Sequence, residues 1–427
     1  MSGDIQSLFE YVKNCFISSG GHLDVDGIRL LDEAKRKLVL HLVGNNVSEI
    51  SRWLDYVKEV LDSLQERFGI KGFTLPKELA SFTASPLDHM KKKLFNYVND
   101  YLSGRLGYED LLKKSLAALT TSLRTNARSC YQLWGFAGTL LHLSNMGYHL
   151  VYPEHRFVSF DRSGKQRLGV IPPNVVLLNL ERGYLSFFYE APRPLSWEDT
   201  SDLQKVWSFY TALRPDLMVY GGRVLDIVDL GSSPPIKRPN IVVEFKELDD
   251  WYLRVRDLKG YFKKSFTAEE WRLRWWQRLR EELIRIADLH HIVEAIEESR
   301  SVRAREPSFR VKEYQLVMLY RATYRPDRMI LVSKSRIPGE IRGYLEDNSI
   351  EIFDGIGFDI EKLKDVANEI ATFTSYGEEN SIAIEIPKEL AILLGKTSKT
   401  LGLNHTEIIR YALKLLIEHY NDTEQPR

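Results

Sequence analysis

The 427-residue sequence contains only two cysteines, Cys15 and Cys130, which lie far apart. This scarcity excludes a disulfide-stapled scaffold and favours a reducing compartment, where each thiol acts as a small buried hydrophobic group. The sequence has no apolar run of about 18 residues, so we expect no membrane-spanning helix and no membrane partner. Its first residues include an acid and no long apolar stretch, which argues against a secretory leader. We therefore expect a cytoplasmic protein.

The chain also lacks a net charge, because 59 Lys and Arg residues are balanced by 59 Asp and Glu residues. Balanced charge predicts no partner, so any nucleic-acid footprint must be local. Hydrophobic residues make up 44% and charged residues 28%, which excludes wholesale disorder and is ordinary for a chain with a real core. Neither a Walker-type glycine loop nor Cys/His zinc spacing occurs.

Apolar spacing divides the chain into three expected domains. Residues 1–128 have the helical period, and residues 129–376 mix a strongly apolar first helix with strands and further helices, which predicts an α/β domain. Residues 380–421 form a separate strand–helix–helix segment after a polar linker. Helices are expected at 28–43, 47–68, 86–102, 108–123, 129–146 and 338–347, and strands at 148–152, 156–160, 174–180, 184–189, 216–220, 240–245, 329–333 and 349–353.

Two of the predicted strands place acids at definite points. Asp216 follows Pro215 at the start of one strand, and Glu244 ends an apolar run in another. Glu244 and Lys246 are two residues apart, so both side chains leave the same strand face, opposite Phe245. Burying acid and amine without partners would cost several kcal/mol each, and a divalent cation between Asp216 and Glu244 would remove that cost. Carboxylate oxygens suit Mg²⁺. The alternative is a surface ion pair and a turn aspartate.

This pattern, Pro215-Asp216 followed by Glu244-Phe245-Lys246, resembles the PD-(D/E)XK nuclease superfamily, over about residues 129–370. The resemblance implies a restriction-endonuclease-like fold, a mixed sheet flanked by helices, and phosphodiester cleavage that depends on Mg²⁺ (or Mn²⁺). It implies that Asp216 and Glu244 are metal ligands, with the backbone carbonyl of Phe245, and that Lys246 is the catalytic lysine.

Two accessory positions depart from the pattern of that superfamily. Gln132 stands on the preceding helix where members often have a metal-binding glutamate, so it would coordinate only as a neutral amide. A Gln-x-x-x-Tyr motif often follows the lysine on a helix, and here Asp257 and Tyr261 occupy its two ends. These departures keep a second hypothesis open, in which the nuclease fold is a relic.

A basic segment follows the candidate site. Residues 251–285 carry ten Lys or Arg against five acids, with Trp271, Trp275 and Trp276 interleaved, and most of this segment lies inside a predicted helix over 253–299. Arg274 and Arg278 fall near one helical face, where they would track phosphates. The alternative is a solvated helix whose tryptophans pack on the core.

The last segment resembles the ribbon-helix-helix family of dimeric DNA-binding modules. A strand over 381–386 precedes Pro387, and Asn404 caps a second helix over 405–420. A unit of this size cannot bury its own core, so pairing with a second copy is expected. The resemblance assigns DNA contacts to strand and helix-start positions: Ser381, Ala383, Glu385, Asn404, His405 and Thr406. A plain oligomerisation tail is the alternative.

We therefore expect a metal-dependent DNA endonuclease that forms a homodimer through its C-terminal module. The second hypothesis is a non-catalytic DNA-binding regulator or partition protein with a relic nuclease fold. A third is a nuclease that acts on RNA.

Overall fold

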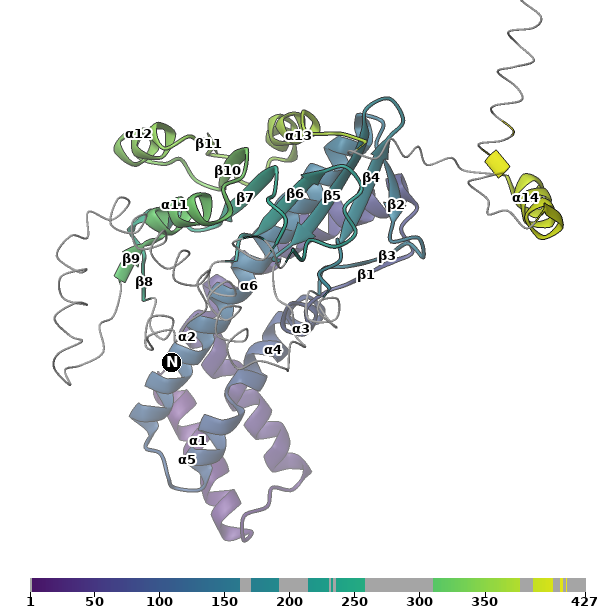
Figure 1. Cartoon of the computed structure of the whole chain (residues 1–427). Helices are drawn as coiled ribbons and strands as arrows, with labels where there is room; N and C mark the ends of the chain where they lie inside the picture. Colours follow the sequence, from purple (N-terminus) through teal and green to yellow (C-terminus); the bar gives the residue numbers. More distant parts are fainter. Residues whose placement is uncertain are drawn as a thin grey trace, which may run out of the picture. The chain divides into compact units, whose positions relative to one another are not determined.

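Helices dominate the first 145 residues, as their apolar period predicts (Figure 1). The computed structural model describes residues 2–161, 170–191, 214–229, 232, 236–257, 310–376, 387–401, 408–409 and 412. Residues 1–377 and 378–427 are two separate units. The helices of the first region are α1 (Ser2–Ser18), α2 (Val25–Phe68), α3 (Lys77–Ala84), α4 (Pro86–Lys93), α5 (Phe95–Leu102) and α6 (Tyr108–Asn145).

Two pairs of predicted helices are single helices in the structure. α2 joins the predicted segments 28–43 and 47–68 across a kink at Val43, where the backbone φ is −143°. α6 joins 108–123 and 129–146 without interruption. In both cases buried apolar side chains continue through the junction, so tertiary burial favours one long helix.

The domain boundary expected at residue 128 falls inside α6. One hydrophobic core contains residues from α1 and α2 as well as from the strands, and α6 contributes along most of its length. The described part of the chain divides instead at Gly377, close to the start of the expected C-terminal segment.

A mixed sheet occupies the rest of the first unit, which confirms the predicted α/β class with a sheet flanked by helices. Its strand order is β11-β10-β7-β6-β5-β4-β2. The strands are β2 (His149–Tyr152), β4 (Val175–Asn179), β5 (Gly183–Tyr189), β6 (Leu217–Gly221), β7 (Ile241–Lys246), β10 (Arg328–Ser333) and β11 (Ile350–Phe353). From β2 to β7 neighbouring strands are antiparallel, whereas β10 lies parallel to both β7 and β11.

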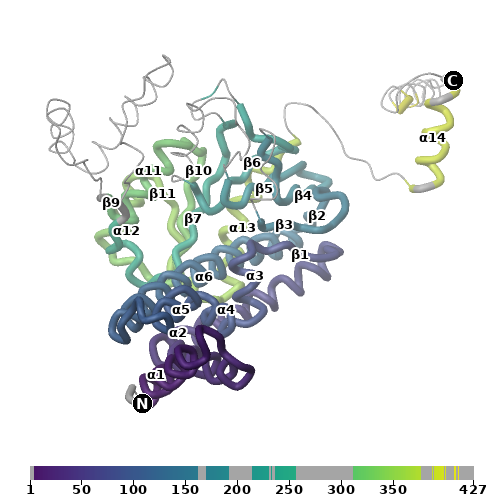
Figure 2. The backbone as a smooth tube through the Cα atoms, turned by 90° about the horizontal axis from the view of Figure 1, so that it is seen from below, coloured from purple at the N-terminus to yellow at the C-terminus, as the bar shows by residue number. Residues whose placement is uncertain are grey.

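Helices cover both faces of this sheet. Alternate residues of β7 and β10 join two different cores, one with α6 and α13 (Lys364–Ala371) and one with α11 (Glu313–Tyr324) and α12 (Gly339–Asp347). α13 follows the short 3₁₀ helix η2 (Ile360–Leu363). Figure 2 shows α6 beside the other helices of the first region, with α11 and α12 near β10 and β11. Successive residues of each strand thus point to opposite faces of the sheet, and each face packs into its own core.

Short strands pair outside the main sheet. β3 (Phe157–Ser159), expected as part of the sheet region, pairs in parallel with β1 (Gly72–Thr74). β8 (Val255–Asp257) pairs antiparallel with β9 (Arg310–Lys312), after the 3₁₀ helix η1 (Trp251–Leu253).

In the second unit, α14 (Lys388–Leu401) begins directly after Pro387, as expected. In the part of the chain that is described, no helix combines the length and apolarity needed to cross a membrane.

Close packing of α6 on β7 depends on Gly135. A Cβ built at this position would lie 2.4 Å from Cε1 of Phe245, inside any permitted contact distance. Phe245 is buried and stands between Glu244 and Lys246 in the sequence, so the helix and the acid-bearing strand share this contact. Because Gly135 has no side chain, α6 can pack closely against β7.

We expect Gly135→Ala to lower the free energy of unfolding by about 1–3 kcal/mol, because the added methyl group overpacks the Phe245 ring. Gly343→Ala is the matched control, since a Cβ on that glycine of α12 meets nothing within 4 Å. The control should raise stability by about 0.5–1 kcal/mol, as alanine does in a helix interior. Urea denaturation measures both, and equal stability of Gly135→Ala and the wild type would contradict the packing argument.

Candidate active site

The candidate site lies where β6 begins and β7 ends. β6 pairs with β7 so that Leu217 lies opposite Val243, and one step further along the same register Asp216 lies opposite Glu244. On β7, Val243 and Phe245 enter the core beneath α6, while Glu244 and Lys246 take the alternate positions. The strand therefore presents an acid and an amine side by side, as their spacing predicts.

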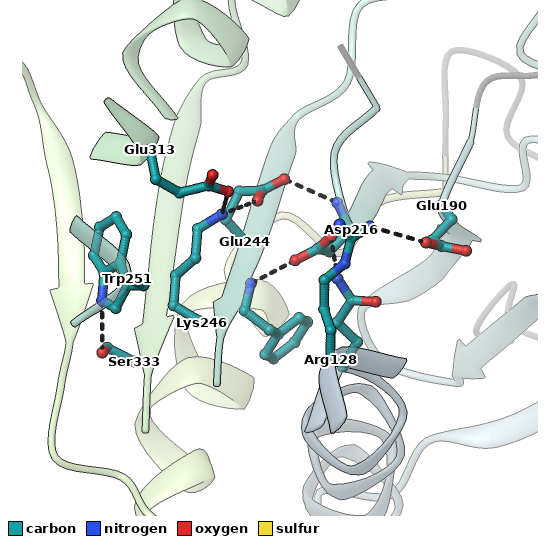
Figure 3. Close-up of polar contacts among 10 residues, drawn as sticks. Arg128, Glu190, Asp216, Glu244, Lys246, Trp251, Glu313 and Ser333 are labelled. Carbon is teal, nitrogen blue, oxygen red and sulfur yellow. Dashed lines mark hydrogen bonds and ion pairs between the residues drawn. The ribbon is translucent and has the colours of Figure 1, made fainter. Parts of the chain in front are cut away.

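Reciprocal hydrogen bonds lock Asp216 to β7. Its Oδ2 accepts a hydrogen bond from the backbone N–H of Phe245 at 2.8 Å, and its own N–H donates to Oε1 of Glu244 at 3.0 Å (Figure 3). Its Oδ1 accepts from Nε2 of Gln132, on α6, at 2.5 Å. Both carboxyl groups are consequently fixed by the backbone and by a helix, with little freedom to turn away.

Lys246 is turned inward, not toward solvent. Its Nζ donates to Oε2 of Glu244 at 3.0 Å and to Oε1 of Glu313 at 3.1 Å, and it lies 5.7 Å from the centroid of the Trp251 ring. Trp251 is held in turn, since its indole N–H donates to Oγ of Ser333 at 3.2 Å. Figure 3 shows Glu313 approaching the amine from the side opposite Asp216. The amine thus has a fixed position between two carboxylates and a ring.

Glu313 is a site residue that the sequence patterns did not identify. It starts α11 directly after β9, more than sixty residues beyond Lys246 in the chain. Sequence spacing relates only residues of one element, so a partner from a distant helix leaves no local pattern. Arg128 and Glu190 were missed for the same reason. The guanidinium of Arg128 lies 3.6 Å from the carboxylate of Glu190, at the Asp216 side of the site (Figure 3).

Burial raises the proton affinity of both acids. Asp216 is 3% exposed and Glu244 is 1% exposed. Desolvation raises the pKa of Glu244 to about 8, and the neighbouring Asp216 carboxylate adds to this, against the opposing effect of Lys246. Desolvation also raises the pKa of Asp216, while Lys246 and Arg128 oppose the rise. The fold therefore holds two carboxyl groups where ionising both is costly.

The donor set fits a divalent cation. Four acidic side chains at the site are buried, Asp216, Glu244, Glu247 and Glu313, whereas among the basic side chains that line the site Lys246 alone is buried. A cation would offset this excess of buried carboxyl groups. Oε1 of Gln132 is also buried, with no hydrogen-bond partner among the described residues. An unsatisfied acceptor beside two carboxylates favours a bound cation or an ordered water.

The cavity at this point is small, about 10 Å³, which is room for one water-sized particle. Within the described ranges, no three His, Cys, Asp or Glu side chains converge on one point in the manner of an all-protein metal cage. The available set is instead two carboxylates with neutral oxygens. Mg²⁺ accepts such a set, because proteins usually bind it through one or two carboxylates.

The accessory residues have mixed outcomes. Gln132 lies on α6, the helix before the sheet, as expected, and it donates a hydrogen bond to Asp216. Asp257 was expected on a helix, but it ends the strand β8, which pairs with β9. The prediction of a helix was therefore wrong for Asp257 and for the described start of the segment 253–299. The other predicted positions lie outside the described residues: Tyr261, Arg274, Arg278, Ser381, Ala383, Glu385, Asn404, His405 and Thr406.

Comparison with known proteins adds no relative, because no family model, curated protein or solved structure matches this chain. The geometry of the site is therefore the basis for a functional proposal.

The raised pKa of Glu244 predicts a pH-dependent stability. The folded protein keeps this proton up to about pH 8, whereas an ordinary glutamate releases it near 4.5. Because the folded state binds more protons in this window, the free energy of unfolding should fall as the pH rises from about 4.5 to 8. Urea denaturation in EDTA measures the slope. Glu244→Gln should flatten it, and the exposed control Glu361→Gln should keep it; an unchanged slope in Glu244→Gln would refute the assignment.

Proposed function

We propose that the chain is a metal-dependent DNA endonuclease, with Mg²⁺ or Mn²⁺ as the cofactor and a restriction-endonuclease-like core. The observation that carries the proposal is that the buried side chains of Asp216, Glu244 and Lys246 lie together where β6 begins and β7 ends. Two acids and one amine in this order, with the intervening Phe245 in the core, are the residues of the PD-(D/E)XK pattern. In the proposal Asp216 and Glu244 hold the metal, with the Phe245 carbonyl.

Each residue has a chemical task in phosphodiester hydrolysis. The metal ion, when bound, supplies charge stabilisation at the phosphate and lowers the pKa of a coordinated water. The ammonium of Lys246 has three donors and no acceptor, so it can orient a water and stabilise negative charge on the attacked phosphate. Glu244 and Glu313 hold that ammonium in place. Water adds to phosphorus and loses a proton to solvent, the bond to the leaving oxygen breaks, and that oxygen takes up a proton, so the products are a phosphate end and a hydroxyl end.

Purified variants test the catalytic assignment. We expect Asp216→Asn and Lys246→Ala each to reduce DNA cleavage by at least about 100-fold, because each removes a group that stabilises the transition state. Substrates should include supercoiled, linear, branched and single-stranded DNA, and RNA, with Mg²⁺ or Mn²⁺ titrated and EDTA as the blank. Asp249→Asn is the matched control, since the exposed carboxylate of Asp249 pairs with Lys334 at 3.2 Å near the end of β7.

The assay has two informative failures. Undiminished cleavage by both site variants would reject the site. DNA binding without nicking by the wild type, under every metal and substrate condition, would favour a regulator or partition protein with a relic fold. The hydrogen bond from Gln132 to Asp216 supports that second candidate, because it occupies one carboxylate oxygen that a metal would otherwise use.

We further propose that residues 380–421 form a ribbon-helix-helix module that dimerises the enzyme and contacts DNA. Support comes from α14, where three large apolar side chains are more than half exposed in a single copy: Leu390 (54%), Ile392 (52%) and Leu393 (58%). Apolar groups so close together on one helix gain free energy when a second copy covers them.

The oligomeric state of the full chain tests this module. Light scattering coupled to gel filtration should give a dimer for the wild type and a monomer for Leu393→Glu, because the carboxylate would be buried in the interface. The control is Lys396→Glu on the same helix, which should remain dimeric. A monomeric wild type, or a dimeric Leu393→Glu variant, would exclude dimerisation through this helix.

A further inference from the structure

A second concave surface lies in the helical region, away from the candidate active site. It is a cavity of about 690 Å³ lined by residues of α2, α4 and the start of α5, which lie side by side in Figure 2. None of its lining residues belongs to the candidate active site. Cavities of this size are in the range of small-molecule sites. The residues that line it are Asp32, Lys35, Asp88, Lys91, Lys92, Lys93, Phe95 and Asn96.

Internal ion pairs account for both acids and for two of the four lysines. Lys91 binds Asp32 of α2 at 2.7 Å and Asp88 of α4 at 2.8 Å. Lys93 binds Glu78 of α3 at 2.5 Å. These pairs tie α4 to its neighbours. With Glu78 counted, three acids face four lysines, so the groove keeps an excess of one positive charge.

Lys35 and Lys92 are the two lysines of the groove that lie outside these ion pairs. Neither ammonium is hydrogen-bonded or ion-paired to another residue in the described ranges. Lys35 is half-buried, and this burial, opposed by Asp32, lowers the pKa of its ammonium, with a further lowering from Lys91. A half-buried ammonium that forms no close ion pair gains free energy when an anion enters the groove. The groove therefore favours a ligand with a negative group.

Phe95 gives the groove an apolar wall. Its side chain is 65% exposed at the first position of α5, next to the exposed amide of Asn96. An exposed ring beside unpaired cations provides a stacking surface together with phosphate contacts, the combination used to bind single-stranded nucleic acids. Asn96 adds donors and an acceptor for a base edge or a sugar.

We propose that this groove binds a nucleotide unit, with its phosphate on Lys35 and Lys92 and its base stacked on Phe95. The unit is either a free nucleotide or part of a single strand. The site is independent of the proposed nuclease chemistry, because it uses different residues from a different part of the fold.

Fluorescence anisotropy with the full chain and labelled oligo(dT) tests the groove, in EDTA to prevent cleavage. Phe95→Ala and the double variant Lys35→Gln/Lys92→Gln should each raise the Kd about tenfold. The double variant should also reduce the dependence of Kd on salt concentration. Tyr11→Ala and Lys114→Gln are matched exposed controls on α1 and α6, and they should bind as the wild type does. Thermal denaturation checks that all variants are folded.

Competition then identifies the source of the nucleotide. Displacement of the label by AMP supports a free nucleotide, and displacement by unlabelled oligo(dT) but not by AMP supports a strand. The proposal is overturned if all variants share the wild-type Kd. It is also overturned if inorganic phosphate competes as well as AMP while Phe95→Ala has no effect, since the groove would then be a simple anion site.

Discussion

The arrangement of the candidate site depends on the reciprocal hydrogen bonds between Asp216 and the end of β7. Each of the two facing acids accepts a backbone N–H from the opposite strand: Asp216 from Phe245, and Glu244 from Asp216. These contacts replace the next rung of the β6–β7 ladder with carboxyl groups. The backbone thereby fixes both acids at the strand ends, in a place where burial alone would exclude them.

The other polar residues of the site contact these two buried acids directly or through Lys246. Lys246 and Glu313 extend the charged cluster on the α11 face, and Gln132 extends it toward α6. The absence of a side chain at Gly135 allows α6 to approach Phe245 closely enough for Gln132, one turn earlier, to reach Asp216. The cluster retains more buried carboxyl groups than buried cations, which is the physical reason for proposing a metal there.

The helical region shares a core with the sheet, and its surface has a separate character. Its internal ion pairs leave two lysines and one aromatic ring around a concave surface, whereas the strand-end site is closed and acidic. If both proposals hold, one part of the molecule would hold a nucleotide unit and another would hydrolyse a phosphodiester bond. The two surfaces belong to one compact unit, so their spacing is fixed by the long helices α2 and α6.

The sequence alone predicted the strands that carry the site, the alternation of Glu244, Phe245 and Lys246, and the mixed α/β class. These features depend on local periodicity, which each segment carries by itself. Only the tertiary structure decided that α6 runs unbroken through residue 128, that Glu313 meets Lys246, and that Asp257 ends a strand. Burial against distant elements keeps α6 continuous where local spacing predicts two helices. Pairing of β8 with β9, and the contact between Glu313 and Lys246, join segments far apart in the chain and leave no trace in residue spacing.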